Sequence, residues 1–285
     1  MQNQHPKVSV LTPIFNTNPE HLRAMIESIL GQTFQDFEFL ILNDSPENQE
    51  IEEIVSQYAA QDNRIKYFKN DKNMGITPSR NKLLEMATGE YIAVFDHDDI
   101  SVPERLEKEV EYLDSHPYVG VVSGWLKFFG DKDDLWTQPE KNLDIKTFMT
   151  EECSVFHTAS MMRKSVLIDN NIHYEEKFSP AEDYRLWAKL MDVTDFHNIQ
   201  EILVKYRWHN ENTTIKRLNK MIEMHDEIQA EICERHPFLR KSYVNNYGTR
   251  LKLRLFGILP ILKIKNRMVL LFDVIPLFKI KKWKY

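Results

Sequence analysis

A cluster of acidic side chains stands directly after one apolar run of the sequence. The largely apolar residues 91–95 precede Asp96, Asp98 and Asp99, and His97 stands between the first two. Carboxylate oxygens are the ligands that Mg²⁺ and Mn²⁺ prefer, and such ions bridge a protein to the phosphate groups of a substrate. Two carboxylates with the spacing of Asp96 and Asp98 can therefore bind a ribose hydroxyl and a metal ion together.

The hydropathy pattern predicts the strands and helices that must position these carboxylates. Apolar, β-rich runs stand at 7–15, 37–44, 65–70, 90–96 and 119–128. Segments with apolar residues at helical spacing lie between them, at 18–30, 47–61, 77–88 and 103–116. Strands that alternate with helices of this length predict right-handed βαβ units and a parallel sheet. The fold class is therefore α/β, with strands buried on both faces.

Polar residues follow three of the predicted strands at the point where each one ends. They are Thr12 after VSVL, the pair Asn43 and Asp44 after FLIL, and Asp96 after YIAVF. Ligands of open α/β sheets bind beyond the carboxyl ends of the strands, so we expect these residues to converge. The competing interpretation is an acidic loop that caps the helix following Pro103.

Composition limits the other classes of function. The chain has 285 residues, 42% of them hydrophobic, and a net charge of −6. Residues 250–285 hold ten basic residues and one acid, a charge of +9, so residues 1–249 carry −15. Two distant cysteines indicate neither a disulfide framework nor a zinc site. The first residues lack the layout of a signal peptide, which favours the cytoplasm.

Six segments, in this order, resemble the motifs of the family 2 glycosyltransferases, which have the nucleotide-binding GT-A fold. They are VSVLTPIFN, QTFQDFEFLILND, NMGITPSRN, GEYIAVFDHDD, AEDYRLW and YRWHNENTT. The resemblance implies a GT-A catalytic domain over 1–215, with a nucleotide-sugar-binding half at about 1–122 and an acceptor-binding half at 123–215. We expect a helical C-terminal extension over 216–285, basic and amphipathic from 250. The relatives that it resembles act in bacterial surface-polysaccharide or lipooligosaccharide synthesis.

The resemblance also implies roles for particular residues. Those that would bind the nucleotide or the donor are Thr12, Pro13, Phe15, Asp44, Asn73, Gly75, Arg80, Asn81, Asp96 and His97. Asp98 and His209 would hold Mn²⁺ or Mg²⁺ at the donor diphosphate. Asp183 would be the catalytic base, and Glu182 would place the acceptor or the donor sugar. Without the resemblance, Asp183 is simply an acid that stabilises the start of a helix.

The sequence departs from the family pattern at three places. Asn43 to Pro46 read NDSP where family members often have DDGS or DDCS, which keeps Asp44 but changes the loop. Phe15 stands where tyrosine is common, so a ring is kept and a hydroxyl is lost. Pro78 stands where the family often has alanine.

The implied activity is a metal-assisted single displacement. A hexosyl or N-acetylhexosaminyl group would move from a nucleotide-sugar, with UDP the first candidate, to a hydroxyl of a lipid-linked glycan, with inversion at the anomeric carbon. Two alternatives stay open: a nucleotide-sugar-binding protein without transferase activity, and a nucleotidyltransferase. The second would need a glycine-rich basic loop after the first strand, and residues 12–21 contain neither glycine nor lysine.

The basic C-terminal segment predicts a membrane surface as partner. Its apolar stretches are interrupted by Lys263, Lys265, Arg267 and Asp273, so they are too short to span a bilayer. The segment suits an element lying on anionic lipid, and Trp283 favours the interface. We therefore expect a peripheral protein on the inner face of the cytoplasmic membrane; the alternative is a helical lid on the domain. Nucleic acid is not expected as a partner, because residues 1–249 would repel it.

Overall fold

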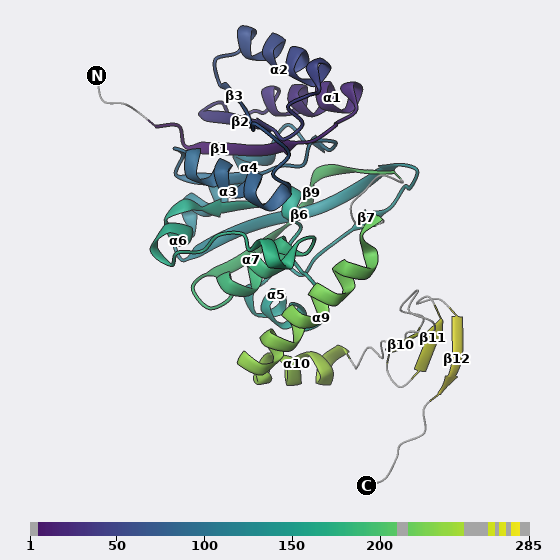
Figure 1. The fold of residues 1–285 in the computed structure, drawn as a ribbon. Coiled ribbons are helices and arrows are strands. Elements are labelled where there is room, and N and C mark those ends of the chain that lie inside the picture. Colours follow the sequence, from purple (N-terminus) through teal and green to yellow (C-terminus); the bar gives the residue numbers. More distant parts are fainter. Residues whose placement is uncertain (1–4, 210–215, 248–261, 266–267, 272–274, 280–285) are drawn as a thin grey trace.

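A nine-stranded mixed sheet forms the centre of the protein (Figure 1). The computed structural model describes residues 5–209, 216–247, 262–265, 268–271 and 275–279, with side chains over the first two ranges. Along the sheet the strands follow the order β3-β2-β1-β4-β8-β6-β9-β5, and β7 pairs with β6. The strands are β1 (Val8–Ile14), β2 (Phe37–Asn43), β3 (Ile65–Lys69), β4 (Tyr91–Val94), β5 (Ile100–Ser101), β6 (Val119–Gly130), β7 (Leu135–Trp136), β8 (Met161–Arg163) and β9 (Asp195–Trp208).

The first four strands are parallel, as the alternating pattern predicts. The helices that connect them are α1 (Pro19–Leu30), α2 (Gln49–Gln61) and α3 (Ile76–Met86). The chain returns from β3 to β4 by way of α3, so the strand order reverses between β1 and β4. The carboxyl ends of β1, β2 and β4 consequently border the crevice where such sheets bind ligands.

Beyond β4 the sheet becomes mixed. The short strand β8 runs antiparallel to both β4 and β6, so β6 regains the direction of β4, and β9 pairs parallel to β6. The carboxyl ends of β6 and β9 therefore point to the same edge of the sheet as that of β4. Sequence patterns could not give this pairing, because β8 has only three residues. The remaining helices before residue 210 are α4 (Arg105–Ser115), α5 (Asn142–Phe148), α6 (Lys164–Asp169) and α7 (Glu182–Leu190), with two short 3₁₀ turns, η1 (His157–Ala159) and η2 (Glu176–Phe178).

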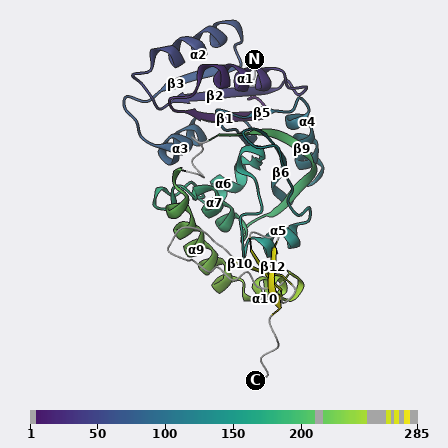
Figure 2. The same cartoon turned by 90° about the vertical axis from the view of Figure 1, so that its right-hand side faces the viewer.

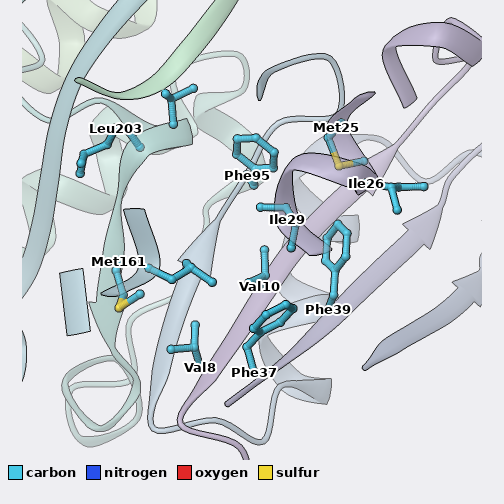
Figure 3. Close-up of a cluster of buried hydrophobic side chains, with 14 of the residues drawn as sticks. Val8, Val10, Met25, Ile26, Ile29, Phe37, Phe39, Phe95, Met161 and Leu203 are labelled. Atoms are coloured by element: carbon cyan, nitrogen blue, oxygen red, sulfur yellow. The ribbon is translucent and has the colours of Figure 1, made fainter. Parts of the chain in front are cut away.

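Apolar residues on the two faces of the sheet form two separate cores. One packs the sheet against α1, α2 and α4, and Figure 3 shows part of it, with Met25 and Ile29 of α1 close to Phe39 and Phe95. The other packs the opposite face against helices that include α3, α5 and α7. Figures 1 and 2 show these helices covering the sheet. Burial of each such side chain contributes about 1.5–3 kcal/mol, so the sheet edge that carries the aspartates is firmly held.

A buried ion pair fixes the end of β4. Arg105 Nη2 donates to the carbonyl oxygens of Val94 at 2.9 Å and Ser160 at 3.1 Å, and Nε donates to Glu109 at 3.2 Å. Both charged side chains are fully buried. Burial raises the pKa of Glu109 to about 7, although the charge of Arg105 opposes this change. The guanidinium ties α4 to the last residue of the strand from which the acidic cluster leaves.

The C-terminal region is only partly helical. The helices α9 (Leu218–Arg235) and α10 (Pro237–Tyr247) agree with the predicted helical extension, and Ile228 and Ile232 are buried in the second core. The described part of the basic segment instead forms the antiparallel strands β10 (Leu262–Lys265), β11 (Met268–Leu271) and β12 (Ile275–Lys279).

A helix was therefore the wrong expectation for residues 262–265, 268–271 and 275–279. The run Leu262–Lys265 alternates apolar and basic residues with a period of two, and Pro276 opposes helix formation. Residues 250–261 and the terminal Trp283 lie outside the described part of the chain. No helix in the described ranges has both the length and the apolar character needed to cross a bilayer.

Candidate active site

Main-chain and side-chain contacts tie the ends of β1 and β4 together. Thr12 is fully buried, and its Oγ1 donates to the carbonyl oxygen of Phe95 at 2.9 Å. Pro13 follows it as a buried residue of the strand, and the ring of Phe15 is 46% exposed just beyond the strand end. Thr17 Oγ1 and His97 Nδ1 lie 3.0 Å apart. The predicted donor-binding turn and the acidic cluster are therefore neighbours.

Asp44 fixes the loop that precedes α3. One carboxylate oxygen accepts from Met74 N and from Asn70 Nδ2, and the other accepts from Gly75 N, each at 2.8 Å. Gly75 has φ +88° and ψ 166°, a region that is almost exclusive to glycine. The carboxylate thus accepts three hydrogen bonds from other groups of the protein.

Arg80 connects the two halves of the site. Its Nη2 donates to Asp96 at 3.1 Å, and its Nη1 donates to Glu182 at 2.6 Å. Burial raises the pKa of Glu182 and of Asp96, and the charge of Arg80 opposes this in both cases. Burial by itself would lower the pKa of Arg80, but the two carboxylates outweigh it and raise that pKa. One guanidinium therefore holds a carboxylate of the turn after β4 and a carboxylate of α7 at the same time.

Asp98 and His209 come together from distant parts of the chain. Oδ2 of Asp98, in the turn after β4, lies 2.9 Å from Nε2 of His209, the residue that follows β9. A carboxylate oxygen and an imidazole nitrogen are both suitable ligands for Mn²⁺. No group of three or more acidic, histidine or cysteine side chains placed to hold a metal exists in the described ranges. The pair fits an ion that takes its other ligands from water and a diphosphate.

Asp99 turns away from this pair into the protein. It is fully buried, and it accepts from Thr158 Oγ1 and from Arg207 N, each at 2.8 Å. Burial raises the pKa of Asp99 well above its ordinary value, and the nearby charge of Asp98 adds to the rise. Asp99 thereby fastens the turn that carries Asp98 to β9 and to the 3₁₀ turn η1.

Asp183 stands at the second position of α7, where its carboxylate accepts from the backbone N of Tyr184 at 2.7 Å. Burial raises its pKa, and the charge of Arg80 partly offsets the rise. Burial raises the pKa of the Cys153 thiol, and the charge of Asp183 adds to the rise. A carboxylate with a raised pKa and few protein donors suits proton abstraction from a hydroxyl.

Two of the residues predicted to bind the nucleotide lie in α3 or in the loop before it. Asn81 bonds the backbone of Tyr174 with both ends of its amide, accepting from N and donating to O at 2.9 Å each. Its amide therefore holds the loop before η2. Asn73 is exposed in the loop between β3 and α3.

Several residues in the site were missed by sequence reasoning. Thr158 and Arg207 hold the acidic turn, Asn70 holds Asp44, and buried His157 lies 2.8 Å from the hydroxyl of Tyr174. Thr158 and His157 belong to a short 3₁₀ turn that has no periodic signal. Only Arg207 could have been suspected, because it stands within the segment that resembles the later histidine motif.

Solved structures share this fold. The *S. aureus* TarS fragment in complex with UDP-GlcNAc superposes with a TM-score of 0.66 at 21% identity, covering 88% of this chain and 77% of that one. The mannosyltransferase PcManGT from *Pyrobaculum calidifontis*, in complex with GDP-Man and Mn²⁺, gives a TM-score of 0.61 at 15% identity, covering 86% and 71%. These likenesses confirm the predicted GT-A fold.

Sequence comparison identifies the family. The model of glycosyl transferase family 2 matches residues 9–170. An uncharacterized glycosyltransferase of *Methanocaldococcus jannaschii* is 34% identical over 220 residues, which is 75% of either chain. The amylovoran biosynthesis glycosyltransferase AmsE of *Erwinia amylovora* is 31% identical over 206 residues, 70% of this chain and 75% of its own. On the ordered motifs, the site geometry and these matches together, the chain belongs to glycosyltransferase family 2.

Proposed function

We propose that this family 2 glycosyltransferase moves a hexosyl or N-acetylhexosaminyl group from a nucleotide-sugar to a hydroxyl of a glycan, with inversion. The observation that carries the proposal is the bridge made by Arg80, with Asp96 on one side at 3.1 Å and Glu182 on the other at 2.6 Å. Through this bridge, the turn suited to a donor and the helix that carries Asp183 meet across one guanidinium.

Different residues carry out different parts of this reaction. Asp183 takes the proton from the acceptor hydroxyl, whose oxygen forms a bond to the anomeric carbon, while the bond from that carbon to the diphosphate oxygen breaks. The nucleoside diphosphate leaves with the electron pair. One base and no protein nucleophile give a single displacement, and a positioned base of this kind contributes about 10²–10⁴-fold in rate. Asp96 orients the ribose, and Phe15 offers a ring for the nucleobase to stack on.

Asp98 and His209 would hold Mn²⁺ or Mg²⁺, which as a Lewis acid would neutralise charge on the leaving diphosphate. Support for this assignment comes from their 2.9 Å approach and their ligand chemistry. The structural neighbour PcManGT was solved with Mn²⁺. Asp99 takes no part in metal binding, because its carboxylate is already bonded to Thr158 and Arg207.

UDP is the first candidate for the nucleotide, because the TarS structures hold UDP or UDP-GlcNAc. GDP is the second, on the example of PcManGT. The relation to AmsE, which is named for the biosynthesis of amylovoran, favours a growing glycan as the acceptor.

Calorimetric titration of UDP, with and without Mn²⁺, tests the donor site. The wild-type protein is expected to bind UDP more tightly with Mn²⁺ than without it, and Asp98→Ala is expected to remove the metal-dependent part. Asp169→Asn, which removes an exposed acid at the end of α6, is the matched control and is expected to bind like wild type. If neither UDP nor GDP binds with Mn²⁺ present, the proposal fails; if Asp98→Ala keeps the metal dependence, the assignment of the metal fails.

The basic segment 250–285 is proposed to bring the enzyme to an anionic membrane surface, where a lipid-linked acceptor would be. Ten basic residues against one acid support this, and each basic residue near anionic lipid contributes about 1 kcal/mol. The full chain is expected to sediment with vesicles containing phosphatidylglycerol in low salt and to be released at high salt. Equal sedimentation with purely zwitterionic vesicles would contradict an electrostatic partner.

A further inference from the structure

Strands β6 and β9 continue past the end of β4 and carry a group of aromatic rings there. Val122 of β6 is level with Ala93 of β4, each paired with Met161. Phe128 is six residues farther along β6, or about 20 Å beyond that level. We call Phe128, Trp136, Phe156, Tyr206 and Trp208 the aromatic platform.

The rings of the platform form a layered surface. Phe128 is its buried floor, 1% exposed, with ring centroids 4.5 Å from Trp136, 5.1 Å from Tyr206 and 5.5 Å from Trp208. Trp136 is 40% exposed on the two-residue strand β7, and Phe156 lies 6.3 Å from it. An indole with this exposure is supported from one side and available to a ligand on another.

Two charged groups lie against the platform. Lys132 Nζ lies over three of its rings, 4.8 Å from the ring centroid of Trp136, 4.9 Å from that of Phe128 and 5.4 Å from that of Trp208. Lys132 Nζ is also 3.0 Å from Asp134, which accepts a hydrogen bond from the indole nitrogen of Trp136 at 3.2 Å. The surface therefore combines aromatic rings with an ammonium and a carboxylate that can form hydrogen bonds. This suits a ligand with one apolar face and many hydroxyl groups at its edge, which describes a pyranose ring.

The platform is continuous with the candidate active site on two sides. Phe156 directly precedes η1, in which Thr158 donates to Asp99 at 2.8 Å, and Trp208 directly precedes His209. The chain after β7 is tied to the same region, because Gln138 Nε2 donates to the carbonyl oxygen of Cys153 at 3.3 Å, three residues before Phe156. A ring bound on Trp136 would accordingly lie next to the elements that carry the acidic turn and His209.

We propose that the aromatic platform binds a pyranose ring of the acceptor glycan, with Trp136 as its stacking surface. The inference rests on the proposed function, and it assigns the acceptor subsite within it. Lys132 and Asp134 supply hydrogen bonds to the hydroxyl groups of that ring. Hydrocarbon fits this surface less well, because it would take the Lys132–Asp134 pair out of water with nothing to replace the lost hydration.

Saturation-transfer NMR with three soluble glycosides tests the platform. The probes are methyl β-D-glucopyranoside, methyl β-D-galactopyranoside and methyl N-acetyl-β-D-glucosaminide, each with the full-length protein. At least one is expected to bind the wild-type protein, with about tenfold weaker binding in Trp136→Ala and an intermediate value in Trp136→Phe, which keeps a ring. The matched control is Tyr118→Ala, which removes a 65% exposed ring just before the opposite end of β6.

Two further measurements separate the sources of failure. In the presence of Mn²⁺, the affinity for UDP is expected to be the same for all variants. If the wild-type protein does not bind the donor nucleotide, the proposed function is wrong, whatever the glycoside result. The subsite is overturned if wild type binds none of the glycosides, or if Trp136→Ala binds them as Tyr118→Ala does. It is also overturned if Trp136→Ala loses only binding to phosphatidylcholine vesicles, because the ring would then serve a membrane.

Discussion

Asp183→Asn is expected to lower the rate of glycosyl transfer by about 10²–10⁴-fold while donor binding stays near the wild-type value. Asparagine keeps the shape of the side chain and can still accept a hydrogen bond from Tyr184 N, which bonds the aspartate at 2.7 Å. It cannot take a proton from the acceptor hydroxyl. Single-turnover transfer with the donor identified by calorimetry measures the loss, and titration of UDP measures the binding.

The pH dependence of the wild-type rate adds a second readout. Burial raises the pKa of Asp183, so the rate is expected to fall on the acid side at a pH above the ordinary aspartate range. The Asn variant should lack this limb. Asp169→Asn, which removes an exposed acid at the end of α6, is the control and should transfer at the wild-type rate. A rate within threefold of wild type for Asp183→Asn would give the role of base to another group.

Arg80→Met is expected to destabilise the fold by about 3 kcal/mol and to abolish tight donor binding. Methionine fills much of the same volume but leaves two carboxylates without their common partner, and breaking a buried pair in this way costs about 3–5 kcal/mol. The lower figure applies because the Asp96 side chain is 32% exposed, whereas that of Glu182 is only 5% exposed. Denaturant unfolding and UDP titration measure the two effects.

A double variant and a surface control sharpen this test. Adding Glu182→Gln to Arg80→Met removes one unpaired buried charge, so part of the lost stability should return. Lys177→Met breaks the pair with Glu227, whose side chains are 69% and 47% exposed, and should change stability by about 1 kcal/mol or less. If Arg80→Met lowers the stability as little as Lys177→Met does, Arg80 does not hold the turn after β4 and α7 together.

Local sequence determined the first half of the fold and the identity of the acidic turn. The continuous apolar runs at β1, β2 and β4 and the helical spacing in α1 and α2 each lie within one element, so they are visible without the rest of the chain. The rule that ligands bind beyond the strand ends then placed Thr12, Asp44 and Asp96 at one edge. The long helix α9 was foreseeable for the same reason.

The pairings of the second half were not available from such patterns. The three-residue strand β8 reverses direction between β4 and β6, and the two-residue strands β5 and β7 have no period to detect. The expected helical form of the basic segment was also wrong over residues 262–265, 268–271 and 275–279. Residues 262–265 alternate apolar and basic side chains, and Pro276 opposes a helix.

The sequence by itself determined which residue types are present to do chemistry, because the types and spacing within one motif are local properties. Only the tertiary structure decided which of them meet. Arg80 reaches Glu182 across 102 positions, and Asp98 reaches His209 across 111. The same folding placed the partly buried Asp98 beside His209 and turned its neighbour Asp99 inward to Thr158. A carboxylate acquires its role from its charge partners and its burial, and both are set by segments far away in the chain.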